Sequence, residues 1–246
     1  MTTSLDPRLV FLSNVRISFP HIAVAQQMKR DNGETYESYG GSFLLEANDP
    51  QFEKFIERCM VVLKEGWKEH VNAAVQVIWA DRKSRCFSAG EEHVSGKTMQ
   101  ILDGYAGKRV ITAYSKTMPQ AIDPNGTPVP PENTMAAQAL HRKIYGGCRV
   151  NVALKPWAQM PNPRNKNNKG IRCDLVAIQF AKDDTPFGEA APDVSNVFGS
   201  VDAPQSAPQS ASSGALPGFL GGAPAAPAPT FGAPGLPSMP PFPGGQ

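Results

Sequence analysis

The sequence of 246 residues predicts an α+β domain made mainly of β-strands, followed by a tail without regular structure. Several segments alternate apolar and polar residues with a period of two, as half-buried strands do. One region between them carries apolar residues at helical spacing. The last 47 residues contain 11 Pro and 8 Gly but one charge, so they hold too little apolar surface to form a core. We expect one folded domain over residues 1–190 and a disordered Pro/Gly/Ala-rich tail over residues 191–246.

The chain opens with an alternating segment at residues 10–19, whose apolar positions predict one buried strand face. These apolar positions are Phe11, Val15, Ile17 and Phe19. Pro20 is expected to end the strand, because proline cannot donate a ladder hydrogen bond. The polar, Gly-containing residues 26–41 are expected to form a mobile loop before a short strand at residues 42–46.

Two helical stretches are expected next. Asp49 is suited to cap the first helix, with Pro50 at its first position. Apolar residues then recur at helical spacing as far as Leu63, and Gly66 separates this helix from a second one at residues 67–79.

Strands return in the second half of the chain, at residues 108–116, 148–157 and 171–180. A turn at residues 123–126 and a short helix at residues 134–144, capped by Asn133, lie between them. Strands with a helical excursion indicate an α+β domain built on a small twisted sheet or barrel.

Charge is distributed unevenly along the chain, although the total is only +2. Residues 104–182 contain 12 Lys and Arg against three acidic residues, whereas residues 183–246 contain five acidic residues and no Lys or Arg. Such asymmetry indicates an anionic partner for the basic segment. The acidic residues that follow are either solubilising spacers or competitors for the basic face.

The sequence argues against several classes of protein. No apolar run reaches the roughly 18 residues of a membrane-spanning helix, and no signal peptide is visible, so we expect a cytoplasmic protein that does not contact membranes. The four cysteines show no zinc-ligand spacing, so we expect reduced thiols and no metal. The segment Gly90–Thr98 resembles a phosphate-binding loop but has one residue too many between its glycines. Because the four histidines are also scattered, we expect neither a cofactor nor an enzyme.

The basic segment carries aromatic residues among its cations. In the strand at residues 148–157 the odd positions place Arg149, Lys155 and Trp157 on the face away from the core. In the strand at residues 108–116 one face combines Tyr114 with flanking lysines. Unpaired bases stack on aromatic rings while cations follow the phosphates, so this combination suits single-stranded nucleic acid. The expected contact residues are Arg16, Tyr105, Lys108, Tyr114, Lys116, Arg149, Lys155, Trp157, Arg164, Lys166, Lys169 and Arg172.

Five segments occur in an order and spacing that resemble a known family. They are VRISFPHI, GGSFLLEANDP, DGYAGKRVITAYSKTMPQAID, IYGGCRVNVALKPW and NKGIRCDLVAIQFAKDDTPFG. Together they resemble a phage single-stranded-DNA-binding protein family with an OB fold. The resemblance implies an OB-type five-stranded barrel with inserted helices. It also implies a protein that coats single-stranded DNA in phage replication or recombination, in the host cytoplasm, without sequence preference and without catalysis.

Two alternatives stay open from the residues alone. The first is an RNA-binding module, because base stacking does not distinguish the sugars. The second is an adaptor that acts through its tail. Phe187, Phe198, Phe219, Phe231 and Phe242 recur about every 11 residues, with one step missing. They are either a coincidence of composition or repeated contacts, for phage or host replication and recombination proteins or for neighbouring protomers on DNA.

Overall fold

The computed structural model describes residues 6–29, 33–130, 132–161 and 169–188. The predicted tail over residues 191–246 lies outside the described residues, as do Arg164 and Lys166, and the domain boundary near residue 190 remains a prediction. The helices are α1 (Pro50–Trp67), α2 (Val71–Ala80) and α3 (Thr134–His141). The strands are β1 (Val10–Lys29), β2 (Thr35–Glu46), β3 (Phe87–Ala89), β4 (Lys108–Ser115), β5 (Gln120–Ala121), β6 (Arg149–Gln159) and β7 (Gly170–Lys182).

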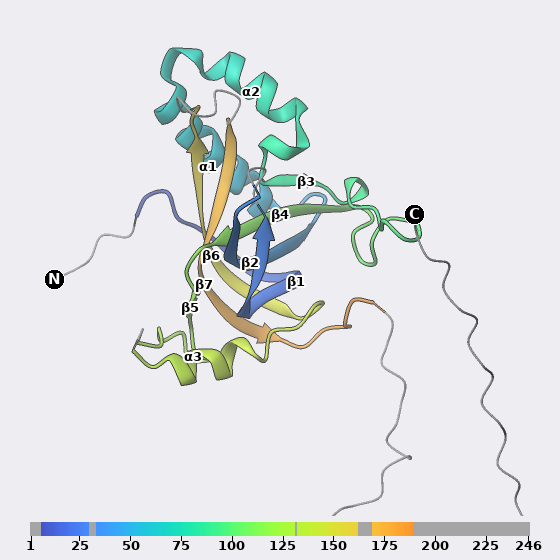
Figure 1. The fold of residues 1–246 in the computed structure, drawn as a ribbon, viewed down its shortest axis with the longest axis vertical. Coiled ribbons are helices and arrows are strands. Elements are labelled where there is room, and N and C mark those ends of the chain that lie inside the picture. Colours follow the sequence, from blue (N-terminus) through green and yellow to red (C-terminus); the bar gives the residue numbers. More distant parts are fainter. Residues whose placement is uncertain (1–5, 30–32, 131, 162–168, 189–246) are drawn as a thin grey trace, which may run out of the picture. The chain divides into compact units, whose positions relative to one another are not determined.

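The strands form one seven-stranded sheet in the order β3-β4-β2-β1-β6-β7-β5, antiparallel except for the β5–β7 pair. The prediction of a mainly β, α+β fold is confirmed. Within the described residues no ladder joins the edge strands β3 and β5, so the sheet is not the closed five-stranded barrel that was expected. Helices α1 and α2 lie at one end of the strands and α3 at the other (Figure 1).

The first helix begins as the sequence predicts. The Asp49 carboxylate accepts a hydrogen bond from the Gln51 backbone N–H, and Pro50 occupies the first turn. The break between α1 and α2 is not at Gly66, which is helical, but at Lys68, whose φ of 48° is left-handed. The buried stripe of α1 packs into the main core, and Phe55, Cys59 and Leu63 are fully buried there.

Strand β1 differs most from its prediction. It continues past Pro20 to Lys29, and the described parts of residues 26–41 pair as β1 and β2 instead of forming a loop. Val15 and Ile17 are buried as expected, but Phe11 and Phe19 are 60% and 54% exposed. The physical reason is a pair of interruptions in the ladders, with left-handed residues at Asn14 and Phe19, which shift the alternation of the strand.

Strand β6 alternates as the sequence predicts. Cys148, Val150, Val152 and Leu154 are buried in the main core. The odd positions lie on the opposite face, which we call the outer face of the sheet, and all but Ala153 are half-buried. In the sheet, β1, β2 and β4 follow one another on one side of β6, and β7 lies on its other side. The outer face therefore extends across most of the sheet.

Candidate nucleic-acid interface

Three of the predicted cations, Arg16 of β1, Lys108 of β4 and Arg149 of β6, line one small hollow of about 50 Å³, together with the carboxylates of Glu46 and Asp49. We call it the basic hollow. Arg16 lies directly opposite Arg149 in the β1–β6 ladder, so two residues 133 positions apart in sequence become neighbours. The two positive charges of such neighbours repel each other, and an anion bound between them offsets this repulsion. The arginine pair is therefore suited to bind an anion.

A short segment after β7 supplies that anion. Residues 183–188, which we call the strap, fold back over the basic hollow. Arg149 Nε donates to Asp184 Oδ2 at 2.6 Å, and Arg16 Nε lies 3.7 Å from the same oxygen. A hydrogen bond from the Thr185 backbone N–H, together with Arg149, holds the pKa of Asp184 below its usual range. The carboxylate is therefore charged at neutral pH.

The strap also places an aromatic ring beside the basic hollow. The Phe187 ring centroid lies 4.1 Å from the Arg16 guanidinium carbon and 6.5 Å from the ring centroid of Tyr105. The Phe187 N–H donates to the Gly146 carbonyl at 2.9 Å, and Arg16 donates to the Thr185 carbonyl. Phe187, the first of the five recurrent Phe residues, is thus part of the fold.

Tyr105 does not lie on the surface. It is 1% exposed and belongs to a small second core with Leu44 and Val110, against which Phe187 packs. Burial raises the pKa of its hydroxyl. The expectation that its ring is available to a base is therefore not met in this structure, because His93 packs on it, at 4.9 Å between ring centroids, as does Phe187.

Lys108 and Tyr114 lie on the outer face of β4. Lys108 Nζ donates to both carboxylate oxygens of Glu46, its ladder partner, at 2.6 Å. Tyr114 is half-buried and lies opposite Gly40, and burial raises the pKa of its hydroxyl. A side chain at Gly40 would collide with the Tyr114 ring, so this glycine makes room for the tyrosine. Lys116 follows the strand and is exposed.

Of the other predicted contact residues, the structure describes Lys155, Trp157, Lys169 and Arg172. All four are half-buried, and all but Lys169 are bonded within the protein. Lys155 Nζ is 2.8 Å from an Asp6 carboxylate oxygen, and Trp157 Nε1 donates to Asp174 at 2.9 Å. Arg172 donates to the Gln159 side chain and to the Lys83 carbonyl. Lys169 is half-buried just before β7. The predicted residues therefore form two groups, one around the basic hollow and one around Trp157.

The sequence left the acidic residues after residue 182 either as solubilising spacers or as competitors for the basic face, and the contacts of Asp184 with Arg16 and Arg149 agree with the second. The course of the strap itself was not predicted. One signal could have drawn attention to it: an aromatic residue, Phe187, lies three residues after Asp184.

Phe11 and Phe19 were missed as surface residues for a different reason. Their exposure depends on the left-handed conformations of Asn14 and Phe19 in β1. Asparagine adopts this conformation more readily than most residues.

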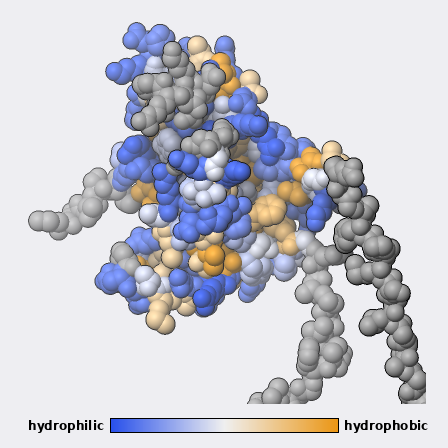
Figure 2. All heavy atoms as spheres, in the orientation of Figure 1, coloured by the Kyte–Doolittle hydropathy of each residue, from blue (hydrophilic) through white to orange (hydrophobic). Residues whose placement is uncertain are grey.

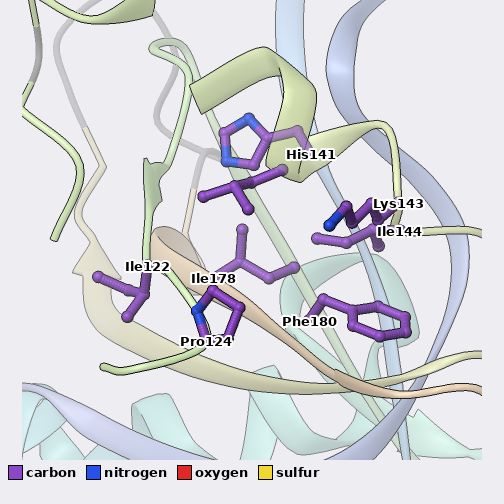
Figure 3. A pocket seen from close by; sticks show the side chains of 8 residues that line it. Ile122, Pro124, His141, Lys143, Ile144, Ile178 and Phe180 are labelled. Atoms are coloured by element: carbon purple, nitrogen blue, oxygen red, sulfur yellow. The ribbon is translucent and has the colours of Figure 1, made fainter. Parts of the chain in front are cut away.

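A second hollow, between α3, β5 and β7, has a different character (Figure 3). It is lined mostly by apolar side chains, among them Ile122, Ile178 and Phe180. His141 also lines it, 1% exposed and with neither ring nitrogen hydrogen-bonded, and burial lowers its pKa to about 4. Lys143 is the one lysine or arginine among the described residues that line it, so this mostly apolar hollow offers little to a polyanion.

In the part of the chain that the structure describes, no group of three or more His, Cys, Asp or Glu side chains is arranged to hold a metal ion. None of the helices described has both the length and the apolar composition needed to cross a membrane.

Comparison with known proteins identifies the family to which the chain belongs. Residues 8–207 match the family described as the single-stranded-DNA-binding protein of Enterobacter phage Enc34. The chain belongs to this family. A putative protein p50 of Acyrthosiphon pisum secondary endosymbiont phage 1 is 25% identical over 177 residues, which cover 72% of this chain and 84% of that protein.

A solved structure supports the fold. It is the single-stranded DNA-binding protein from bacteriophage Enc34 in complex with single-stranded DNA, with a TM-score of 0.52 and 24% identity. The match covers 74% of this chain and 90% of that one. The open sheet with its inserted helices is therefore an OB-type arrangement of the kind found in phage single-strand binders, as the resemblance of the sequence implied.

Proposed function

We propose that this protein binds single-stranded DNA without sequence preference and coats it during phage DNA replication or recombination, in the cytoplasm of the host cell. The observation that carries the proposal is the Arg16–Arg149 pair, held around one carboxylate on the outer face of a chain from a single-stranded-DNA-binding family. A phosphate, like the Asp184 carboxylate, has negatively charged oxygens that accept hydrogen bonds from guanidinium groups. The role is one of binding, with no catalytic step.

The chemistry follows from the two groups of residues. Arg16, Lys108 and Arg149 take backbone phosphates at the basic hollow, with Lys116 further along β4. Lys155, Lys169 and Arg172, with Arg164 and Lys166 of the intervening segment, extend the positive track past Trp157. Each phosphate bound releases condensed counterions, which makes affinity depend steeply on salt. Tyr114 and Trp157 contribute ring faces for stacking, which is tolerant of base identity.

Tail-mediated recruitment of phage or host replication and recombination proteins is a second part of the proposal. It rests on the four Phe residues of residues 191–246, since the fifth, Phe187, is engaged in the strap. An RNA-binding role is the main alternative, because the cations and rings named above would serve either nucleic acid.

The test is the salt dependence of single-stranded DNA binding in wild-type protein and in Arg149→Gln. Loss of one phosphate contact lowers the slope of log affinity against log salt by about 0.7 and weakens binding at every sequence. Lys54→Gln, which removes an exposed cation of α1, is the matched control and leaves the slope unchanged. An unchanged slope in Arg149→Gln would remove the basic hollow from the DNA site.

A further inference from the structure

Stacking requires an aromatic ring that a base can reach, and the structure limits which rings meet that need. Of the aromatic residues that the sequence assigned to stacking, Tyr105 is buried, and Tyr114 and Trp157 are half-buried. Phe11 is 60% exposed on β1, although the alternation of the sequence had assigned it to the core. Single exposed apolar side chains are common on protein surfaces, so the exposure of Phe11 gains meaning only from the residues around it.

The neighbours of Phe11 are small. Across the sheet it lies opposite Ala153 of β6, which lies opposite Ala177 of β7, which lies beside Gln120 of β5. Paired residues point to the same face, so this row has an aromatic ring at one end, an exposed glutamine at the other and two alanines between them. Ala153 is 8% exposed and Ala177 is half-buried, so the two small side chains form a low floor beside the ring and leave the ring exposed at its end of the row.

Cations lie on both sides of this row. Along β6, Lys155 is two residues beyond Ala153 on the same face, about 7 Å away, and Arg149 is four residues before it, about 13 Å away. The bulge at Asn14 brings Arg16 to this face as well. Asn14 donates its N–H to Asn151 Oδ1 at 2.9 Å and accepts from Arg149 at 3.0 Å, which fixes the shift in register. Phe11 therefore lies between Lys155 and the basic hollow.

The polar groups next to the floor are already bonded to one another. Asn151 Nδ2 donates to Gln179 Oε1 at 2.7 Å, and Gln179 Nε2 donates to the Asp123 carbonyl at 2.6 Å. These amides are the groups that could read the edge of a base, and their hydrogen bonds hold them within the protein. The row thus offers a ring, a floor and flanking charges but little means of distinguishing one base from another.

We infer that Phe11 is a base-stacking residue, with an unpaired base lying over Ala153 and Ala177 and its flanking phosphates at Lys155 and Arg149. The inference deepens the proposed function and rests on it. It commits to an unpaired base as the occupant because a protein partner would need a larger apolar area than one ring, and duplex DNA does not expose its base faces.

The experiment measures single-stranded DNA affinity for Phe11→Ala, Phe11→Leu, Phe11→Trp and the control Met135→Ala, which truncates an exposed side chain of α3. Phe11→Ala is expected to weaken binding about 5- to 100-fold. Phe11→Leu, which keeps apolar contact but lacks a ring, is also weakened. Phe11→Trp retains affinity, and its fluorescence is quenched by single-stranded DNA more than that of wild-type protein. Met135→Ala binds like wild type.

A second variant tests the floor without touching the ring. Ala177→Leu raises the floor on the far side of Ala153 from Phe11 and is expected to weaken binding to a similar degree. If wild-type protein binds single-stranded DNA while the Phe11 variants and Ala177→Leu bind equally well, the inference is overturned and the proposed function stands. If wild-type protein fails to bind single-stranded DNA, the proposed function itself fails. Thermal unfolding of each variant separates loss of binding from loss of fold.

Discussion

Replacing Asp184 by Asn is expected to strengthen binding of single-stranded DNA. The Asp184 carboxylate lies 2.6 Å from Arg149 and 3.7 Å from Arg16, so a phosphate entering the basic hollow must displace it. Each of these partly exposed pairs contributes roughly 0.2–1 kcal/mol. Removing both therefore favours DNA by about 0.5–2 kcal/mol, which is about a 2- to 30-fold gain in affinity.

The assay is a fluorescence anisotropy titration of a labelled oligonucleotide at fixed salt. Asp183→Asn is the matched control, because Asp183 accepts from the Tyr145 hydroxyl at 3.0 Å and carries the same charge one residue away. The reasoning predicts a larger gain for Asp184→Asn than for Asp183→Asn. Equal gains would indicate a general effect of net charge, and no gain for Asp184→Asn would refute displacement of this carboxylate by DNA.

Three further predictions concern the strap, the buried histidine and Trp157. Gly147→Ala, at φ 110° and in close contact with Thr185 and Pro186, should unseat the strap and strengthen DNA binding without changing any charge; weaker binding in the same titration would contradict this. Burial lowers the pKa of His141 to about 4 in the folded state, against about 6.5 in the unfolded state. The unfolded chain therefore binds a proton first as the pH falls. The contribution of His141 to the free energy of unfolding is complete above pH 6.5 and falls by up to about 3 kcal/mol as the pH drops towards 4. Urea unfolding of wild-type protein and His141→Leu across this range measures it, and the variant should lose most of the dependence. Trp157→Ala should cost roughly 1–3 kcal/mol of single-stranded DNA affinity, measured alongside Trp157→Phe, which keeps a ring and should retain most of it.

The parts of the fold that local chemistry decides were predictable from the sequence. Asp49 and Pro50 start α1 because capping depends on residues within one turn, and the faces of β6 follow from simple alternation. The faces of β1 did not follow from alternation, because Asn14 and Phe19 adopt left-handed conformations that are fixed by neighbouring strands.

The candidate site shows the same division. The cations Arg16, Lys108 and Arg149 could be named from charge and strand position alone. Their partners could not, because Glu46 is brought to Lys108 by a ladder, and Asp184, 35 residues after Arg149, is brought to the arginines by the strap. Whether a cation is available to DNA depends on these long-range contacts, which leave no periodic signal in the sequence.

The most direct test of the account is a competition titration of the wild-type protein with single-stranded DNA, duplex DNA and RNA at several salt concentrations. The account predicts that single-stranded DNA binds most tightly and that its affinity falls steeply as salt increases. Equal affinity for duplex DNA, or an affinity that does not change with salt, would contradict it, and tighter binding of RNA would favour the alternative function.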